Sequence, residues 1–105
     1  IAFVSKYVDS FVKWDLMRFF HENPHTIDAV DNIARYIGRD AEVVSEELAE
    51  LAERGFLEEV LMEKLTVYAL TSDLRMQKKL ARFMYASEDQ KLRSKIIFRL
   101  LRDGM

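Results

Sequence analysis

The chain has 105 residues, half of them hydrophobic, which is the usual size for one domain with a modest core. It contains no cysteine, which excludes disulfides, thiolate metal sites and cysteine nucleophiles and favours a cytoplasmic location. The net charge is only -2, and no apolar run approaches the roughly 20 residues that cross a bilayer, so we expect a soluble protein with no membrane partner.

The N-terminal part of the chain has the apolar spacing of two helices. A short helix is predicted within residues 1–9, and the apolar stripe then changes phase near Phe11. Ser10 is a suitable cap for a new helix at that point. This first core helix is expected to end before Pro24, because proline disfavours helical dihedral angles at the preceding residue.

Two further helices follow, each with a cap and a glycine exit. After a short extended piece at Thr26-Ile27, Asp28 is expected to cap the second helix and Gly38 to end it in a left-handed conformation. Asp40 is expected to cap the third helix, which ends at Gly55. The apolar positions of this third helix, spaced as one buried face, are Val44, Leu48, Leu51 and Ala52.

The remaining chain is predicted to form a hairpin and two helices. Two strand-like runs are joined near residues 62–64, although this turn has no Gly, Asn or Asp. A helix is expected from the cap residue Asp73 to about Ala86. Ser87 with Gln90 has the spacing of a capping box, which predicts a last helix over about 88–102.

This order of elements resembles the winged helix-turn-helix superfamily, in particular prokaryotic transcriptional regulators. The most specific segments are "AVDNIARYIG" for the second helix, "RDAEVVSEELAELAERGFLEE" for the third helix entering the wing, and "VYALT" for the closing strand. The resemblance implies a mainly α (α+β) fold with a β-hairpin wing over residues 1–73. Residues 74–105 would form a helical dimerisation element, and the implied function is DNA-binding transcriptional regulation by a homodimer.

The third helix has an unusual charge for a DNA-reading element. Its periodicity places four glutamates and no cation on the outward face, which in this superfamily enters the major groove. Such a face opposes association with a polyanion, although a glutamate can accept a hydrogen bond from cytosine. One interpretation is that the glutamates are simply a solvated helix face. The other is that they form a protein-binding surface together with the apolar tip of the hairpin. The candidate protein contacts are Glu42, Glu46, Glu50, Glu53, Leu61 and Met62.

The C-terminal segment has the opposite charge. Residues 1–73 carry seven basic and fifteen acidic side chains, a net charge of -8, whereas residues 74–105 carry nine and three, a net charge of +6. The basic residues recur on one helical face, which is either solvated, in contact with phosphate, or paired with the glutamates of the third helix. The candidate DNA contacts are Arg39, Ser45, Lys64, Arg75, Lys78, Lys79 and Arg82.

Other chemistry has little support in the sequence. His21 and His25 have acidic neighbours, but Pro24 lies between them, so they do not share a helical face and no metal site or cofactor is predicted. No nucleophile-base pattern or phosphate-binding glycine loop is present, and we expect no enzyme activity. The aromatic residues Trp14, Phe19, Phe20 and Tyr36 could line a ligand pocket, but their helical spacing favours core positions.

Two functional hypotheses follow. The first is a DNA-binding transcriptional regulator whose contacts lie mainly outside the acidic face of the helix at residues 41–54. The alternative is a winged-helix module that binds a protein partner with a basic or apolar surface.

Overall fold

A computed structural model describes residues 8–103 of the chain. The predicted N-terminal helix falls mostly on residues 1–7, which lie outside the described residues, and Val8 and Asp9 are not helical. The described elements, in chain order, are α2 (Phe11–Glu22), β1 (Ile27–Ala29), α3 (Val30–Ile37), α4 (Ala41–Glu53), β2 (Leu57–Met62), β3 (Leu65–Leu70), α5 (Leu74–Glu88) and α6 (Gln90–Asp103).

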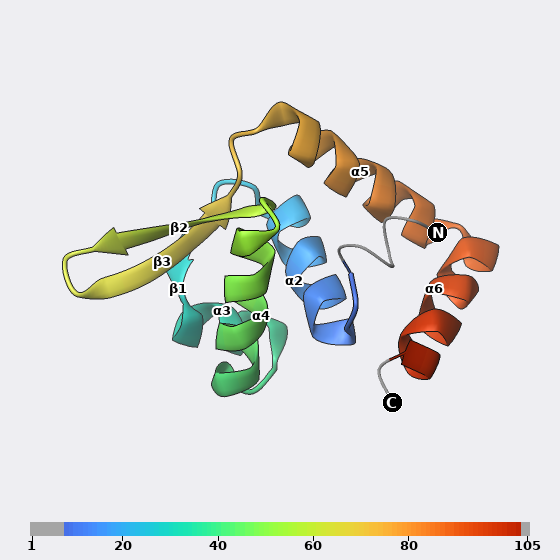
Figure 1. Ribbon diagram of the computed structural model, residues 1–105, viewed down its shortest axis with the longest axis horizontal. Helices are drawn as coiled ribbons and strands as arrows, with labels where there is room; N and C mark the ends of the chain where they lie inside the picture. The colour runs from blue at the N-terminus through green and yellow to red at the C-terminus, as the bar shows by residue number, and fades with distance from the viewer. Residues whose placement is uncertain (1–7, 104–105) are drawn as a thin grey trace.

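The helices α2, α3 and α4 pack together beside a three-stranded antiparallel sheet with strand order β1-β3-β2. The hairpin of β2 and β3 projects from this body as a wing (Figure 1). Helix α5 packs on α2 along another edge, and α6 turns back from its end. The predicted class, a mainly helical α+β protein, is confirmed, and the arrangement is winged-helix-like.

Of the three helices predicted before the hairpin, two begin at the predicted cap residue. The Ser10 hydroxyl accepts a hydrogen bond from the Lys13 amide at 3.1 Å, and the Asp40 carboxylate accepts one from the Val43 amide at 3.2 Å. Gly38 ends α3 with a φ of 71°, a left-handed conformation that glycine adopts without steric cost. These three predictions are confirmed.

The predicted cap of α3 is wrong. Asp28 lies in β1, and the residue that precedes α3 is Ala29, which makes no side-chain capping bond. The Asp28 carboxylate instead accepts hydrogen bonds from the Ala29 amide and the Asn32 side chain, at 2.8 and 2.7 Å. Strand pairing of Asp28 with Tyr68 extends the sheet past the expected start of the helix.

The hairpin turn is where the sequence placed it. Met62 pairs with Leu65, so Glu63 and Lys64 form a two-residue turn. Glu63 has a φ of 58°, the left-handed conformation that Gly, Asn or Asp would ordinarily supply. The regular pairing of β2 with β3 along their whole length therefore holds a turn whose own residues do not favour it.

The break between the two C-terminal helices differs from the predicted capping box. Helix α5 continues to Glu88, so Ser87 lies in its last turn, buried, and its hydroxyl donates to the Met84 carbonyl at 2.7 Å. The cap of α6 is Asp89, whose carboxylate accepts hydrogen bonds from the Lys91 amide at 3.0 Å and from the amide that follows it at 3.2 Å. Because Ser87 packs into the interior as part of α5, Asp89 rather than Ser87 caps α6.

A hydrogen bond from Tyr68 of β3 to Glu59 of β2 joins the two strands of the wing. The ring is buried, and the phenol donates a hydrogen bond to Glu59 at 2.7 Å. Burial, followed by the hydrogen bond and the negative charge of Glu59, raises the pKa of Tyr68 to about 12.

We expect Tyr68 to ionise near pH 12, and Glu59→Gln to lower this pKa towards 10 by removing the charge. Because the folded pKa is raised, the associated stability is fully present below pH 10 and is lost as the pH rises from 10 to 12. Tyrosinate absorbance during alkaline titration measures the ionisation, and Tyr68→Phe identifies its contribution. A transition near pH 10 for Tyr68 in the folded wild-type protein would contradict the assignment.

Candidate functional site

Helix α4 presents an acidic outward face. Val44, Leu48 and Leu51 are completely buried, so the register of the helix is the one predicted. The opposite side exposes its acidic residues with a serine between them, and the helix itself carries no lysine or arginine. The exposed polar residues on this face are Glu42, Ser45, Glu46 and Glu53.

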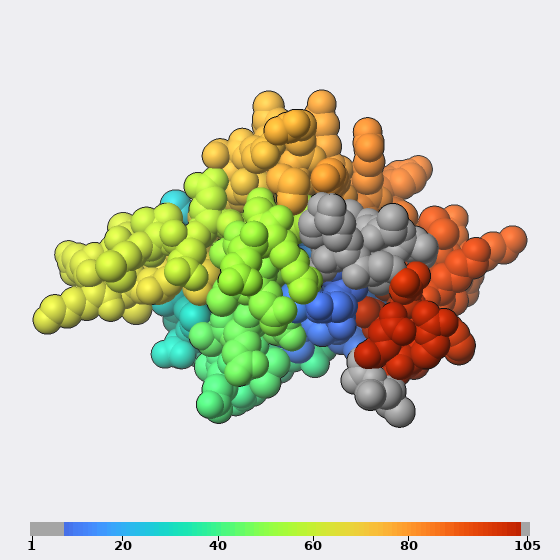
Figure 2. All heavy atoms as spheres, viewed as in Figure 1, coloured from blue at the N-terminus to red at the C-terminus, as the bar shows by residue number. Residues whose placement is uncertain are grey.

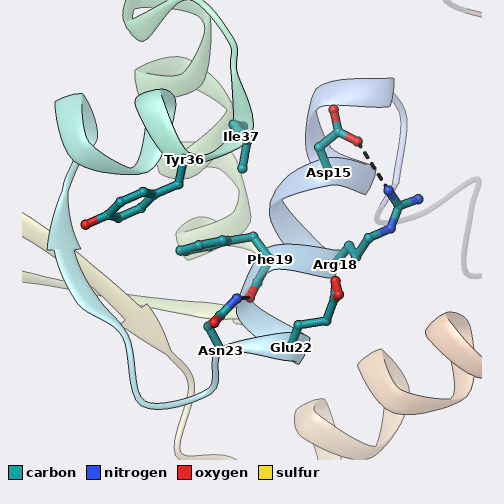
Figure 3. Close-up of a pocket in the computed structure, with 7 residues that line it drawn as sticks. All are labelled: Asp15, Arg18, Phe19, Glu22, Asn23, Tyr36 and Ile37. Atoms are coloured by element: carbon teal, nitrogen blue, oxygen red, sulfur yellow. Dashed lines mark hydrogen bonds and ion pairs between the residues drawn. The ribbon is translucent and has the colours of Figure 1, made fainter.

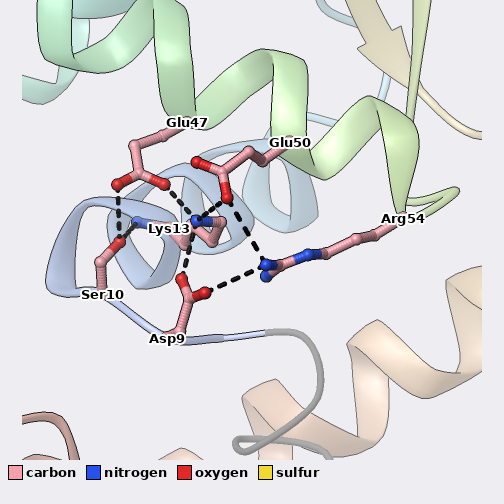
Figure 4. A network of polar contacts seen from close by, with 6 residues as sticks. All are labelled: Asp9, Ser10, Lys13, Glu47, Glu50 and Arg54. Carbon is pink, nitrogen blue, oxygen red and sulfur yellow. Dashed lines mark hydrogen bonds and ion pairs between the residues drawn. The ribbon is translucent and has the colours of Figure 1, made fainter. Parts of the chain in front are cut away.

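Glu50 does not belong to this outward face, which corrects its predicted position. Its carboxylate lies 3.4 Å from the Lys13 ammonium and 3.5 Å from the Arg54 guanidinium (Figure 4). It therefore faces α2 and the end of its own helix. The reason is the angular position of Glu50, one turn from both Glu47 and Arg54, on the side of α4 that packs against α2.

Lys13 lies at the centre of this polar network and was not anticipated from the sequence. The residue is 1% exposed, and its ammonium group donates to Asp9 at 2.7 Å and also to Glu47. The Ser10 hydroxyl donates to the other oxygen of Glu47 at 3.2 Å, and Arg54 pairs with Asp9 at 3.0 Å. The network joins the segment before α2, α2 itself and α4 (Figure 4).

The network stabilises Lys13 in its charged form. Burial by itself lowers the pKa of the ammonium group, but the hydrogen bonds and negative charges of Asp9 and Glu47 outweigh it and raise the pKa above its ordinary value. A signal was present in the sequence, because Lys13 precedes the buried residues Leu16 and Met17 by three and four positions. A lysine on the apolar face of a helix needs an internal counterion.

Arg39, a candidate DNA contact just before α4, forms an ion pair with Asp15 of α2. Its Nε and Nη2 donate to the same oxygen of Asp15 at 2.9 and 2.6 Å. The side chain remains 40% exposed, but it connects the α3–α4 turn to α2. The cation nearest the start of the acidic helix is thus already paired.

The wing has an apolar tip, as its sequence suggested. Leu61 and Met62 are 71% and 55% exposed, and Leu65 opposite them is 56% exposed. Lys64 is exposed in the turn between the strands. A cluster of exposed large apolar side chains is typical of a contact surface rather than of a solvated hairpin.

The basic face of α5 is solvent-exposed on a different edge of the molecule. Figures 1 and 2 place α5 along the upper edge, the wing tip at the left and the start of α4 at the bottom. The candidate DNA contacts are therefore not gathered into one surface within a single chain. Arg75, Lys78 and Arg82 form no ion pair with α4 in the described part of the chain.

The aromatic residues divide between core and surface. Trp14 and Phe20 are buried in the core, as expected. Phe19 stacks on Tyr36 with a ring-centroid distance of 5.7 Å, and Tyr36 is 61% exposed. The two rings border an open pocket of about 240 Å³ with charged residues, including Asp15, on its rim (Figure 3).

Two other features of the described residues bear on function. Within residues 8–103, no three His, Asp or Glu side chains come together as ligands for a metal ion. Over the same range, no helix combines the length and apolar character needed to cross a bilayer.

Comparisons with known proteins support the fold. No protein-family model matches the chain, and no curated protein matches it. A solved structure described as a possible transcriptional regulator from Methanosarcina mazei Go1 is similar, with a TM-score of 0.56 and 15% sequence identity. The similarity covers 81% of this chain and 78% of the other. At this identity the likeness concerns the arrangement of the elements.

Proposed function

We propose that the protein is a regulator of transcription that binds duplex DNA through the basic face of α5, outside the acidic face of α4. The observation that carries the proposal is the set of four exposed cations on one face of one helix. Lysine and arginine that neutralise phosphates and release counterions supply most of the affinity for DNA. The structural neighbour, described as a possible transcriptional regulator, agrees with this assignment. The cations are Arg75, Lys78, Lys79 and Arg82.

Insertion of α4 into the major groove is disfavoured by its own charge. Glu42, Glu46 and Glu53 would all approach a polyanion, and a carboxylate finds a favourable base contact only at an exocyclic amine, such as cytosine N4. The arginines at the two ends of the helix, Arg39 and Arg54, are held by acidic side chains. Ser45 lies on this acidic face and Lys64 in the wing turn, so neither adds to the basic face of α5 within one chain.

A homodimer would bring two basic faces to one duplex. Large apolar side chains on α6 are exposed in the single chain: Phe98 is 66% exposed and Leu101 53%. We propose that residues 74–105, together with residues 1–10, form the dimer interface and that residues 1–73 form the winged domain. Two copies related by a two-fold axis would present the α5 faces as a pair.

The direct test is a mobility-shift titration of the wild-type protein with duplex DNA at low ionic strength. We expect retention of the duplex at micromolar protein, weakening steeply as the salt concentration rises. Unrelated duplexes separate non-specific from specific binding. Failure to retain any duplex at low salt would refute the DNA-binding proposal.

The acidic face of α4 and the wing tip favour a second candidate function. Leu61 and Met62 are exposed at the tip, and the exposed glutamates of α4 form a strip of one charge. A partner protein with an apolar and basic surface fits both features. Under this alternative, changing Leu61 and Met62 to Ser would abolish capture of that partner and leave the DNA titration unchanged.

A further inference from the structure

A second hollow, which shares Arg18 and Glu22 with the pocket of Figure 3, lies where α2, α5 and α6 meet. Its volume is about 480 Å³, and its walls come from the end of α2, the end of α5 and the first turns of α6. Junctions between structural units are frequent positions for small-molecule sites. The hollow is distinct from the acidic face of α4 and from the wing. Its walls include Arg18, Glu22, Met84, Ser87, Glu88 and Arg93.

The charged residues around the hollow are of both signs, and they form no ion pairs with one another in the described part of the chain. Glu22, Glu88 and Arg93 form no ion pair with any described residue. Among the described residues, Arg18 forms one ion pair, with Asp15 at the long distance of 3.9 Å. Two cations and two anions, together with the imidazole of His21, thus line one hollow, and the hydrogen-bonding capacity of the four charged groups is largely available.

Trp14 positions the two arginines beside the hollow. The guanidinium carbons of Arg18 and Arg93 lie 6.0 and 5.4 Å from the centre of its ring, within the range of cation–π attraction. Trp14 is 4% exposed, packs edge-on against Phe83 and is therefore a rigid support. Its buried Nε1–H has no acceptor in the described part of the chain, and Trp14 lies behind the two arginines rather than in the wall of the hollow.

We propose that this hollow binds a free α-amino acid. Arg18 and Arg93 would hold the carboxylate, Glu22 and Glu88 the ammonium group, and Met84 would contact the side chain. Arginine suits a carboxylate because its planar donors match the two oxygens. A simple anion would meet the two glutamates and a simple cation the two arginines, so a zwitterion is the ligand that matches both pairs.

Binding at this position would link the winged body to the C-terminal helices. The amino acid would connect α2 with the end of α5 and the start of α6, and thereby reduce their freedom to move relative to one another. This regulatory consequence rests on the proposed function of α5 in DNA binding. The binding site itself does not depend on it.

The test uses the intrinsic fluorescence of Trp14, which is the only tryptophan in the chain. Each non-aromatic L-amino acid is titrated alone into the wild-type protein while the fluorescence is recorded. For every amino acid that changes the fluorescence, calorimetry then measures the binding affinity. We expect saturable binding of at least one of them. Its N-acetyl derivative and its decarboxylated amine, which each lack one charge, should bind at least about tenfold more weakly.

Substitutions then locate the site. Arg93→Gln and Glu88→Gln should each weaken the amino acid at least about tenfold, whereas Lys91→Gln, on the same helix but outside the hollow, should keep the wild-type affinity. No saturable binding, equal binding of the single-charge derivatives, or equal binding by the Arg93 and Glu88 variants would each overturn the proposal. DNA retention is measured separately without amino acid, so its failure refutes the regulator and not the site.

Discussion

Replacing Lys13 by alanine is expected to lower the free energy of unfolding by about 2–4 kcal/mol, because it leaves a group of carboxylates without their central counterion. Lys13 is 1% exposed, and its ammonium group bridges Asp9, Glu47 and Glu50. Glu47 has only 16% of its side chain exposed, so solvent cannot fully replace the lost cation. Asp9 and Glu50 are partly solvated and keep Arg54 as a partner, which is why the expected loss of stability extends down to about 2 kcal/mol.

The measurement is urea unfolding followed by circular dichroism near pH 7. Lys78→Ala is the matched control, because this lysine is exposed on α5, and we expect a change within about 0.5 kcal/mol. Lys13→Met combined with Glu47→Gln should recover much of the lost stability by removing both buried charges. A loss below about 1 kcal/mol in Lys13→Ala would show that the network contributes little.

The network also predicts how stability depends on pH. The folded pKa of Asp9 is lowered: burial opposes this, but the hydrogen bonds and charges of Lys13 and Arg54 prevail. The contribution of Asp9 to the free energy of unfolding is therefore present above pH 3.8, and it is lost as the pH falls through the folded pKa, which lies below 3.8. Lys13 has the opposite sign: its contribution is present below pH 10.5 and is lost as the pH rises through its higher folded pKa.

Changing Arg75, Lys78, Lys79 and Arg82 together to Gln is expected to weaken DNA binding by at least about 100-fold at low salt. The four side chains lie exposed on α5, so their loss should leave the fold intact. If all four contact phosphates, the slope of log affinity against log salt concentration should fall by about 4. Mobility shifts over a series of salt concentrations give both quantities.

Two control variants show whether the effect belongs to α5 or to the overall charge. Changing Lys91, Lys95 and Arg102 of α6 to Gln removes three exposed cations and should weaken binding by less than about threefold. Changing Glu42, Glu46 and Glu53 to Gln should leave binding unchanged or slightly tighter. Equal affinity of the α5 variant and the wild type would reject the role of α5, and a marked loss with the α4 variant would place that helix in the groove.

The acidic residues of α4 lie on two sides of the helix. Lys13, Glu47 and Glu50 fix α4 against α2 from the inner side, whereas Glu42, Glu46 and Glu53 face solvent on the other. A helix that is this acidic on both sides depends on Lys13 and Arg54 for its position. The acidic residues of α4 therefore have two roles, attachment within the fold and exposure to a partner.

Local sequence determined most of the secondary structure. The buried spacing of Val44, Leu48 and Leu51, the caps Ser10 and Asp40 and the left-handed Gly38 depend only on residues a few positions apart. Helical periodicity and capping act over that range, so the sequence was sufficient for the mainly helical α+β class and for the outward direction of Glu42 and Glu46.

Tertiary structure decided which charges are free. Lys13 reaches Glu47 across 34 positions, and Arg39 reaches Asp15 across 24. Burial of Ser87 likewise moved the cap of α6 to Asp89. These outcomes depend on how helices pack, because an ion pair or a buried hydroxyl is set by distance and solvent exposure rather than by spacing along the chain. The same physics separates the basic face of α5 from the acidic face of α4.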